Sequence, residues 1–109
     1  MTGLEAFGAL DLRVGRILSA EPLAGARKPA YKLSLDLGAL GVKGCSAQLT
    51  DLYKPEDLIG RLVVCAVNLG PRRIAGFVSE VLVLGAPDEA GRVVLLAVER
   101  EVPLGGKVY

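Results

Sequence analysis

Short apolar runs separated by turn residues dominate this chain and exclude most helical folds. Each run is rich in Val, Leu and Ile, and Gly, Pro or Asp separates it from the next run. This is the pattern of β-strands joined by turns. The predicted strands are residues 12–20, 31–37, 42–48, 61–68, 81–86 and 93–98.

The run 31–37 has the clearest alternation. Every second residue from Tyr31 onward is apolar, and the residues between them, beginning with Lys32, are polar. One face of this strand is therefore expected in a core and the other in water. Residues 62–67 and 93–98 are apolar on both faces, which predicts strands covered by the core on one side and by a partner on the other.

Helical signals are short. Thr2 and Glu5 have the spacing of a capping box and predict a single helical turn. Pro55, followed by two acidic residues, predicts a short helix within 51–59. This helix falls between the third and fourth predicted strands. We therefore expect an all-β fold: a five-stranded Greek-key barrel of the oligonucleotide-binding (OB) type, with terminal extensions and one domain over 1–109.

The composition predicts a small domain with more apolar surface than its own core can bury. Of the 109 residues, 51% are hydrophobic and 23% are charged, and no apolar run is long enough to span a bilayer. A domain of this size buries only about 65% of its surface. We therefore expect a homodimer without membrane insertion, with residues 102–109 lying outside the barrel and contributing to the interface.

Residue types exclude most catalytic chemistry. The chain has no His, which removes Ser-His-Asp and Cys-His nucleophiles and His-containing metal sites. Its two cysteines, Cys45 and Cys65, lack Cys-x-x-Cys spacing and are expected to be buried thiols. The prediction is a binding protein with no catalytic residues, no metal and no cofactor. Glu5 and the lack of a basic and apolar leader predict a cytoplasmic location.

Two groups of cations are candidate ligand contacts. Arg27 and Lys28 lie in a loop, and Lys32 and Lys43 on the next two predicted strands, where they are expected to converge against Asp36 alone. Four cations in this arrangement would attract phosphate or an acidic peptide. The alternative is an ordinary solvated loop.

The second group follows a Gly-Pro turn. Arg72 and Arg73 present two adjacent guanidinium groups that can bind carboxylates or phosphates. The alternative is a simple barrel connection, in which one arginine pairs with Glu80 while Asn68 and Ser79 tie the turn to the sheet.

Small polar residues in the third predicted strand leave room for a ligand. Ser46 and Gln48 are expected to point the same way, toward a ligand or a second barrel packed closely. Apolar peptide contacts are expected near Tyr31, Phe77 and Ser46. The candidate ligand-binding residues are Arg27, Lys28, Tyr31, Lys32, Lys43, Ser46, Gln48, Asn68, Arg72, Arg73, Phe77 and Ser79.

Short motifs follow one another in a specific order over nearly the whole chain. They are LDLRVG at 10–15, ARKPAYKL at 26–33, SAQLT at 46–50, YKP at 53–55, VNL at 67–69, PRRIAGF at 71–77 and SEVLVLG at 79–85. Their order resembles the tRNA-binding-domain superfamily, and within it the CsaA type of stand-alone, export-related chaperone. The resemblance implies an OB barrel, a homodimer formed outside the barrel, and binding of unfolded or precursor polypeptides without catalysis.

The resemblance also implies an alternative ligand. Superfamily members that bind tRNA carry Ser-x-Gly-Met after the Pro-basic-basic turn. Here Ser79 matches, but Val81 and Leu82 stand in place of the Gly and Met. Glu80, between Ser79 and Val81, would repel phosphate. The preferred hypothesis is therefore a polypeptide-holding chaperone with weak, salt-sensitive tRNA binding. The alternative is a stand-alone, structure-specific tRNA-binding protein.

Overall fold

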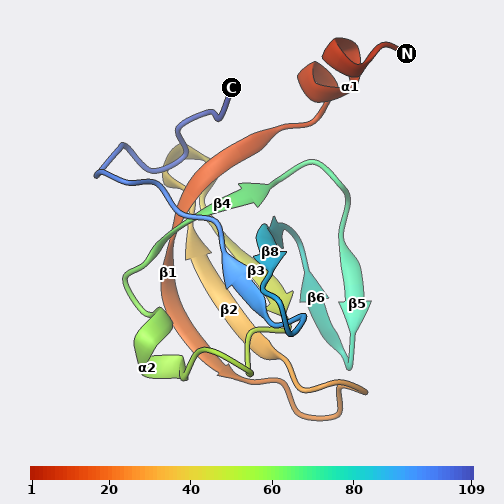
Figure 1. Ribbon diagram of the computed structural model, residues 1–109, viewed down its shortest axis with the longest axis vertical. Coiled ribbons are helices and arrows are strands. Elements are labelled where there is room, and N and C mark those ends of the chain that lie inside the picture. Colours follow the sequence, from red (N-terminus) through yellow and green to blue (C-terminus); the bar gives the residue numbers. More distant parts are fainter.

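The computed structural model describes residues 1–109 and contains the predicted strands (Figure 1). The strands are β1 Leu12–Pro22, β2 Tyr31–Asp36, β3 Val42–Ala47, β4 Leu62–Ala66, β5 Arg72–Ile74, β6 Phe77–Ser79, β7 Leu82–Val83, β8 Gly85–Pro87 and β9 Val93–Leu95. The helices are α1 Gly3–Ala9, the 3-10 turn η1 Gly38–Leu40, and α2 Pro55–Leu58.

One long strand, β1, organises the barrel. The main sheet has five strands in the order β3-β2-β1-β4-β7, and all neighbours are antiparallel. The first part of β1 pairs with β4, and the part beyond Arg16 pairs with β2, with a bulge between Ile17 and Ser19. The barrel nearly closes where the N–H groups of Glu80 and Val81 donate to the Gly44 carbonyl, at 2.8 and 3.3 Å. The predicted OB-type barrel is confirmed.

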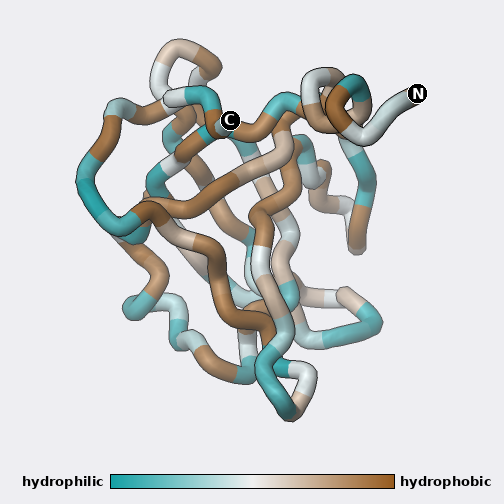
Figure 2. Tube along the Cα trace, turned by 45° about the horizontal axis from the view of Figure 1, so that its top comes forward, coloured by the Kyte–Doolittle hydropathy of each residue, from teal (hydrophilic) through white to brown (hydrophobic).

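The core fills the inside of this barrel. The predicted alternation of β2 is confirmed, because its odd-numbered residues are buried and its even-numbered residues are partly exposed. Leu58 of the predicted short helix α2 is fully buried and packs in the same core. Figure 2 shows the strands that cross the middle as mostly hydrophobic and the peripheral loops as mostly hydrophilic.

The second apolar face of β4 is covered by the chain itself. Val64 and Ala66 form a small buried cluster with Leu12, and part of its cover comes from Leu84 and Val108. The expectation that a partner covers this face is wrong for β4. It stays open for β9, where Val94 is 41% exposed.

The C-terminal segment is part of the sheet, contrary to the prediction that it lies outside the barrel. The Gly105 N–H donates to the Val14 carbonyl at 2.7 Å, the Val14 N–H donates to Gly106 at 2.9 Å, and the Val108 N–H donates to Leu12 at 2.9 Å. These backbone bonds occupy the edge of β1 that β2 leaves free. Gly105 and Gly106 stand where a strand would show alternating side chains, so this segment gives no strand signal in the sequence.

Helix α1 is longer than the single turn predicted. The capping box is formed as expected, with the Glu5 N–H on the Thr2 hydroxyl and the Thr2 N–H on the Glu5 carboxylate, both at 3.1 Å. The helix extends over seven residues but buries none of them, and it projects away from the barrel (Figure 1). No helix of the structure is long and apolar enough to cross a membrane.

The segment 68–80, expected as a turn and connection, forms a hairpin. β5 and β6 pair through Arg72 with Ser79 and Ile74 with Phe77. Ala75 and Gly76 connect the strands with φ of 50° and 81°, the two left-handed residues of a type I′ turn. The run 81–86, expected as one strand, is divided into β7 and β8.

Removing residues 105–109 is expected to lower the free energy of unfolding by about 3 kcal/mol, because three backbone hydrogen bonds and the contact of Val108 are lost. Urea unfolding followed by circular dichroism measures the change. Deleting Tyr109 alone, which is 100% exposed, is the control and should leave the midpoint unchanged. Equal effects of the two truncations would contradict the role of the tail in the sheet.

Candidate functional site

The β5–β6 hairpin is held against β3 by hydrogen bonds and by one close contact. The Ser46 N–H donates to the Ser79 hydroxyl at 2.9 Å, and the Gly44 N–H donates to the Glu80 carboxylate at 3.1 Å. A Cβ at Gly44 would lie 2.9 Å from the Phe77 ring and 3.2 Å from the Val78 carbonyl oxygen. Glycine at position 44 therefore lets the hairpin pack closely on β3.

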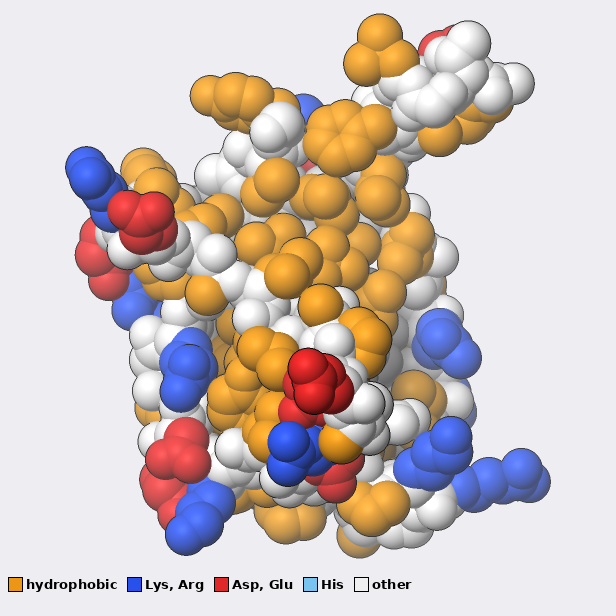
Figure 3. Space-filling view, viewed as in Figure 1, with side chains coloured by type: hydrophobic (Ala, Val, Ile, Leu, Met, Phe, Trp, Pro, Cys, Tyr) orange, Lys and Arg blue, Asp and Glu red, His pale blue; other side chains and the backbone are white.

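A basic pocket of about 520 Å³ lies between the β1–β2 loop, the end of β3, and β5. Side chains from three distant segments line it: Arg27 and Lys28 from the loop, Ser46 and Gln48 from β3 and the residues after it, and Arg72 and Arg73 from β5. The structure thus brings together half of the predicted site residues. Figure 3 shows Lys and Arg side chains at the lower right, over β5 and this loop.

The four cations of the basic pocket have no acidic neighbours in its wall. No Asp or Glu lines the pocket, and none of the four cations forms a salt bridge. Arg73 makes only a long contact, with its guanidinium donating to the Gly76 carbonyl at 3.4 Å. The pocket is therefore suited to an anion such as a phosphate or a carboxylate.

Lys32 and Lys43 do not join this cluster, contrary to the prediction of four converging cations. Lys32 forms an ion pair with Glu21 at 3.0 Å. Lys43 lies opposite Leu35 in the β2–β3 register, on the other sheet face from Lys32, and pairs with Glu80 at 3.8 Å. The sequence did not reveal these acids as partners because they come from other strands or connections.

Three other predicted site residues hold the fold together. The Tyr31 hydroxyl is buried and donates to the Tyr53 carbonyl at 2.8 Å. Asn68 accepts from the Asp11 N–H at 2.9 Å and donates to the Ala9 carbonyl at 2.8 Å. Ser79 is buried. For Asn68 and Ser79, the alternative of tying the connection to the sheet describes the structure.

Glu80 and Val81 lie away from the basic pocket, although the sequence predicts that both lie beside the ligand. Glu80 does not pair with Arg72 or Arg73, because Lys43 and the Gly44 N–H engage its carboxylate. Val81 is only 6% exposed and belongs to the core. Neither residue lines the basic pocket, and the charge of Glu80 is offset by Lys43.

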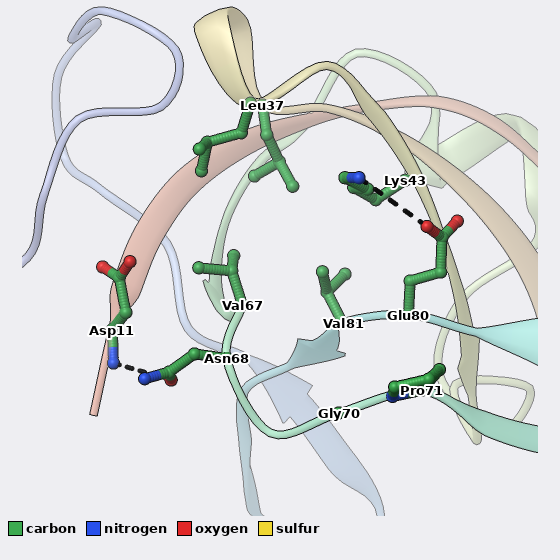
Figure 4. Close-up of a pocket in the computed structure, with 10 residues that line it drawn as sticks. Asp11, Leu37, Lys43, Val67, Asn68, Gly70, Pro71, Glu80 and Val81 are labelled. Carbon is green, nitrogen blue, oxygen red and sulfur yellow. Dashed lines mark hydrogen bonds and ion pairs between the residues drawn. The ribbon is translucent and has the colours of Figure 1, made fainter. Parts of the chain in front are cut away.

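Sequence reasoning missed a second pocket, at the mouth of the barrel (Figure 4). It also measures about 520 Å³, and Leu37, Val67, Lys43 and Glu80 are among its lining residues. Asp11 lies at its edge, where hydrogen bonding to a guanidinium lowers the pKa of its carboxyl group. The charged groups here have partners within the protein, which leaves little capacity for a charged ligand.

The cysteines are the buried thiols that the sequence predicts. Cys45 and Cys65 are free and fully buried. Burial raises the pKa of Cys65 to about 12, so its reactive thiolate is scarce near neutral pH. No cluster of three or more His, Cys, Asp or Glu side chains is placed to hold a metal ion.

The barrel and the basic pocket define a binding domain of the OB class. Residues 12–107 match the family model described as "Putative tRNA binding domain". The methionine–tRNA ligase of Methanocaldococcus jannaschii is 39% identical over a match of 105 residues, and the match covers 91% of this chain but only 15% of the ligase. The chain belongs to the tRNA-binding-domain family.

Solved structures with the same fold include chaperones of the CsaA type. The chaperone CsaA from Bacillus anthracis is 52% identical, with a TM-score of 0.93 over 100% of this chain and 99% of that chain. CsaA from Picrophilus torridus is 41% identical, with a TM-score of 0.93 over 100% of both chains. A MetRS related protein from Pyrococcus horikoshii is 29% identical, with a TM-score of 0.88 over 100% of this chain and 98% of that chain. These matches confirm the resemblance to CsaA.

Gly44→Val is expected to destabilise the protein by about 1–3 kcal/mol, because a side chain at this position would meet the Phe77 ring and the Val78 carbonyl. The cost should be smaller in a Phe77→Ala background, where part of the obstruction is gone. Urea denaturation of the four proteins of this double-mutant cycle measures the coupling. If Gly44→Val lowered the free energy of unfolding equally in both backgrounds, the Phe77 ring would not be the group that obstructs a side chain at position 44.

Proposed function

We propose that this protein is a homodimeric chaperone that holds unfolded or precursor polypeptides and catalyses no reaction. The observation that carries the proposal is the similarity to CsaA chaperones, at 52% and 41% identity and with a TM-score of 0.93 for each. We place the protein in the cytoplasm, where a reducing environment keeps Cys45 and Cys65 as free thiols.

A second function, tRNA binding, is favoured by the basic pocket. Its four cations come from two segments and face no acidic side chain within the pocket. Glu80, the residue that argued against phosphate, pairs with Lys43 outside this pocket. The family match to a tRNA-binding domain also supports this candidate. A site of four cations gives binding that depends strongly on salt.

The two functions differ in how salt affects them. With four phosphate contacts, the logarithm of the tRNA association constant should fall with the logarithm of salt concentration with a slope of about −3. Apolar polypeptide contacts should persist at physiological salt, because burial of apolar surface is not screened. Fluorescence titration of labelled tRNA and of a urea-denatured precursor protein, at low and physiological salt, separates these cases.

Arg72→Ala with Arg73→Ala should bring the tRNA salt slope close to −1.5, because half of the cations of the basic pocket are removed. Arg100→Ala is the control, since Arg100 is exposed outside the pocket, and it should keep the wild-type slope. Tight tRNA binding that persists at physiological salt, together with no binding of the precursor, would make tRNA binding the function and overturn the chaperone proposal.

The homodimer is proposed from apolar surface that the fold leaves open. α1 buries no residue, and its Leu4 and Phe7 are 83% and 46% exposed. Figure 3 shows hydrophobic side chains continuing from the helix and C-terminal end down over β4 and β8. A second copy covering this face would remove a large apolar area from water.

Sedimentation at micromolar concentration is expected to give twice the chain mass of 11.4 kDa. Leu4→Asp with Phe7→Asp should shift the mass to the monomer, because the charges would be buried in the interface. Leu69→Asp, at a position 57% exposed on the β4–β5 connection, is the control and should leave the dimer intact. A monomeric mass for the unmodified protein would refute the dimer.

A further inference from the structure

We infer that apolar polypeptide segments bind in a hollow separate from the basic pocket, lined by β6 instead of β5. This neutral hollow measures about 400 Å³, within the size range of binding sites for organic ligands. Its wall includes Lys32 from β2, Val42 and Lys43 from β3, and Phe77, Val78 and Glu80 from β6 and the residue after it. The inference rests on the proposed chaperone function and assigns the place where it acts.

The charges of the two hollows differ. Four cations and no acid line the basic pocket. The neutral hollow has two cations and two acids, arranged as the ion pairs Lys32–Glu21 at 3.0 Å and Lys43–Glu80 at 3.8 Å. A phosphate entering it would be repelled by the two carboxylates, and the two lysines that could attract it are already paired with those carboxylates. A segment without net charge would meet no uncompensated charge.

Apolar side chains are exposed between these ion pairs. Val42 is 59% exposed and Val78 is 38% exposed, while the Phe77 ring is partly buried with the Lys32 ammonium 5.8 Å from its centre. The wall also contains Ser34 and Gly44, a pair of small residues opposite each other in the β2–β3 register. The Phe77 ring and the Val78 carbonyl fill the space over Gly44, so the small side chain of Ser34 is the member of this pair that leaves room for side chains of another chain.

An extended segment of unfolded polypeptide has the chemistry that this hollow accepts. It presents apolar side chains at intervals of about 6.6 Å along one face, and they can cover Val42, Val78 and Phe77. Its unpaired backbone groups and polar side chains can remain near the charged rim formed by the two ion pairs. A polyanion lacks both features and is directed to the basic pocket.

Substitutions on the two sides of the hairpin test this separation. The probe is a peptide of ten residues of Leu, Val and Ser, with a neutral methoxycoumarin joined to its N-terminus through an amide and an amidated C-terminus, so that neither the peptide nor its label is charged. Val42→Asp with the uncharged Val78→Asn, chosen because Val78 is paired with Arg73 in the hairpin register, should weaken peptide binding about tenfold or more while leaving tRNA binding within about twofold. Arg72→Ala with Arg73→Ala should give the reverse pattern.

The control for added charge is Ile59→Asp. The exposed fraction of Ile59 is 55%, similar to the 59% of Val42, but Ile59 lies outside the hollow. This variant should bind peptide as the unmodified protein does. Circular dichroism melting checks that each variant folds. If Asp at position 42 and Asn at position 78 prevent folding, Val42→Ser and Val78→Thr replace them, with a loss of about threefold expected.

Each result decides between the hypotheses. Peptide binding to the unmodified protein that the substitutions at Val42 and Val78 do not weaken overturns the neutral hollow while keeping the chaperone function. Displacement of bound peptide by saturating tRNA also overturns it, because one shared site would then bind both. No peptide binding to the unmodified protein, together with no binding of the denatured precursor, overturns the chaperone function and this inference with it.

Discussion

The pairing of β1 on both of its edges is the constraint on which the rest of the barrel depends. Its eleven residues pair with β4 at one end and with β2 at the other, and the bulge after Ile17 lets one strand serve both. The Ile17 N–H and carbonyl bond to Arg61 and Gly60, which places the end of α2 under the barrel. The edge that β2 does not reach is filled by the C-terminal segment, so the chain closes its own sheet without a partner strand there.

The parts of the fold that the sequence predicted are those with a signal of residue type over several positions, such as the alternation of β2, the continuous apolar run of β4 and the Pro and two acids that begin α2. The run beginning at Tyr31 is long enough to show a period of two, and its burial follows that period. β5 and β6 have three residues each, too few for a period to be visible. The C-terminal segment pairs at Gly105 and Gly106, and two glycines without side chains show no alternation of apolar and polar residues.

The sequence predicts the individual residues of the candidate site but not which of them lie in one pocket. Arg27, Lys28, Arg72 and Arg73 were recognised as two separate basic groups, and only the fold shows that they share one pocket. Lys32 is expected in the same group because it lies on the exposed face of the strand that follows the loop. An ion pair across strands neutralises it, and sequence proximity carries no information about such partners. Glu80 was misassigned for the same reason, since proximity to Arg73 in the sequence does not bring their charges together.

The β5–β6 hairpin separates two surfaces with different charge, and this separation depends on how firmly the hairpin is held. β5 lines the basic pocket, while β6 lines the neutral hollow. Hydrogen bonds at Gly44 and Ser46 fix the hairpin to β3, and the missing side chain of Gly44 allows Phe77 to lie against the strand. If the hairpin moved away, the wall between the surfaces would move with it, and the ion pair between Lys43 and Glu80 would be strained. A close backbone contact at one glycine therefore keeps an unopposed cationic site beside a charge-compensated apolar one.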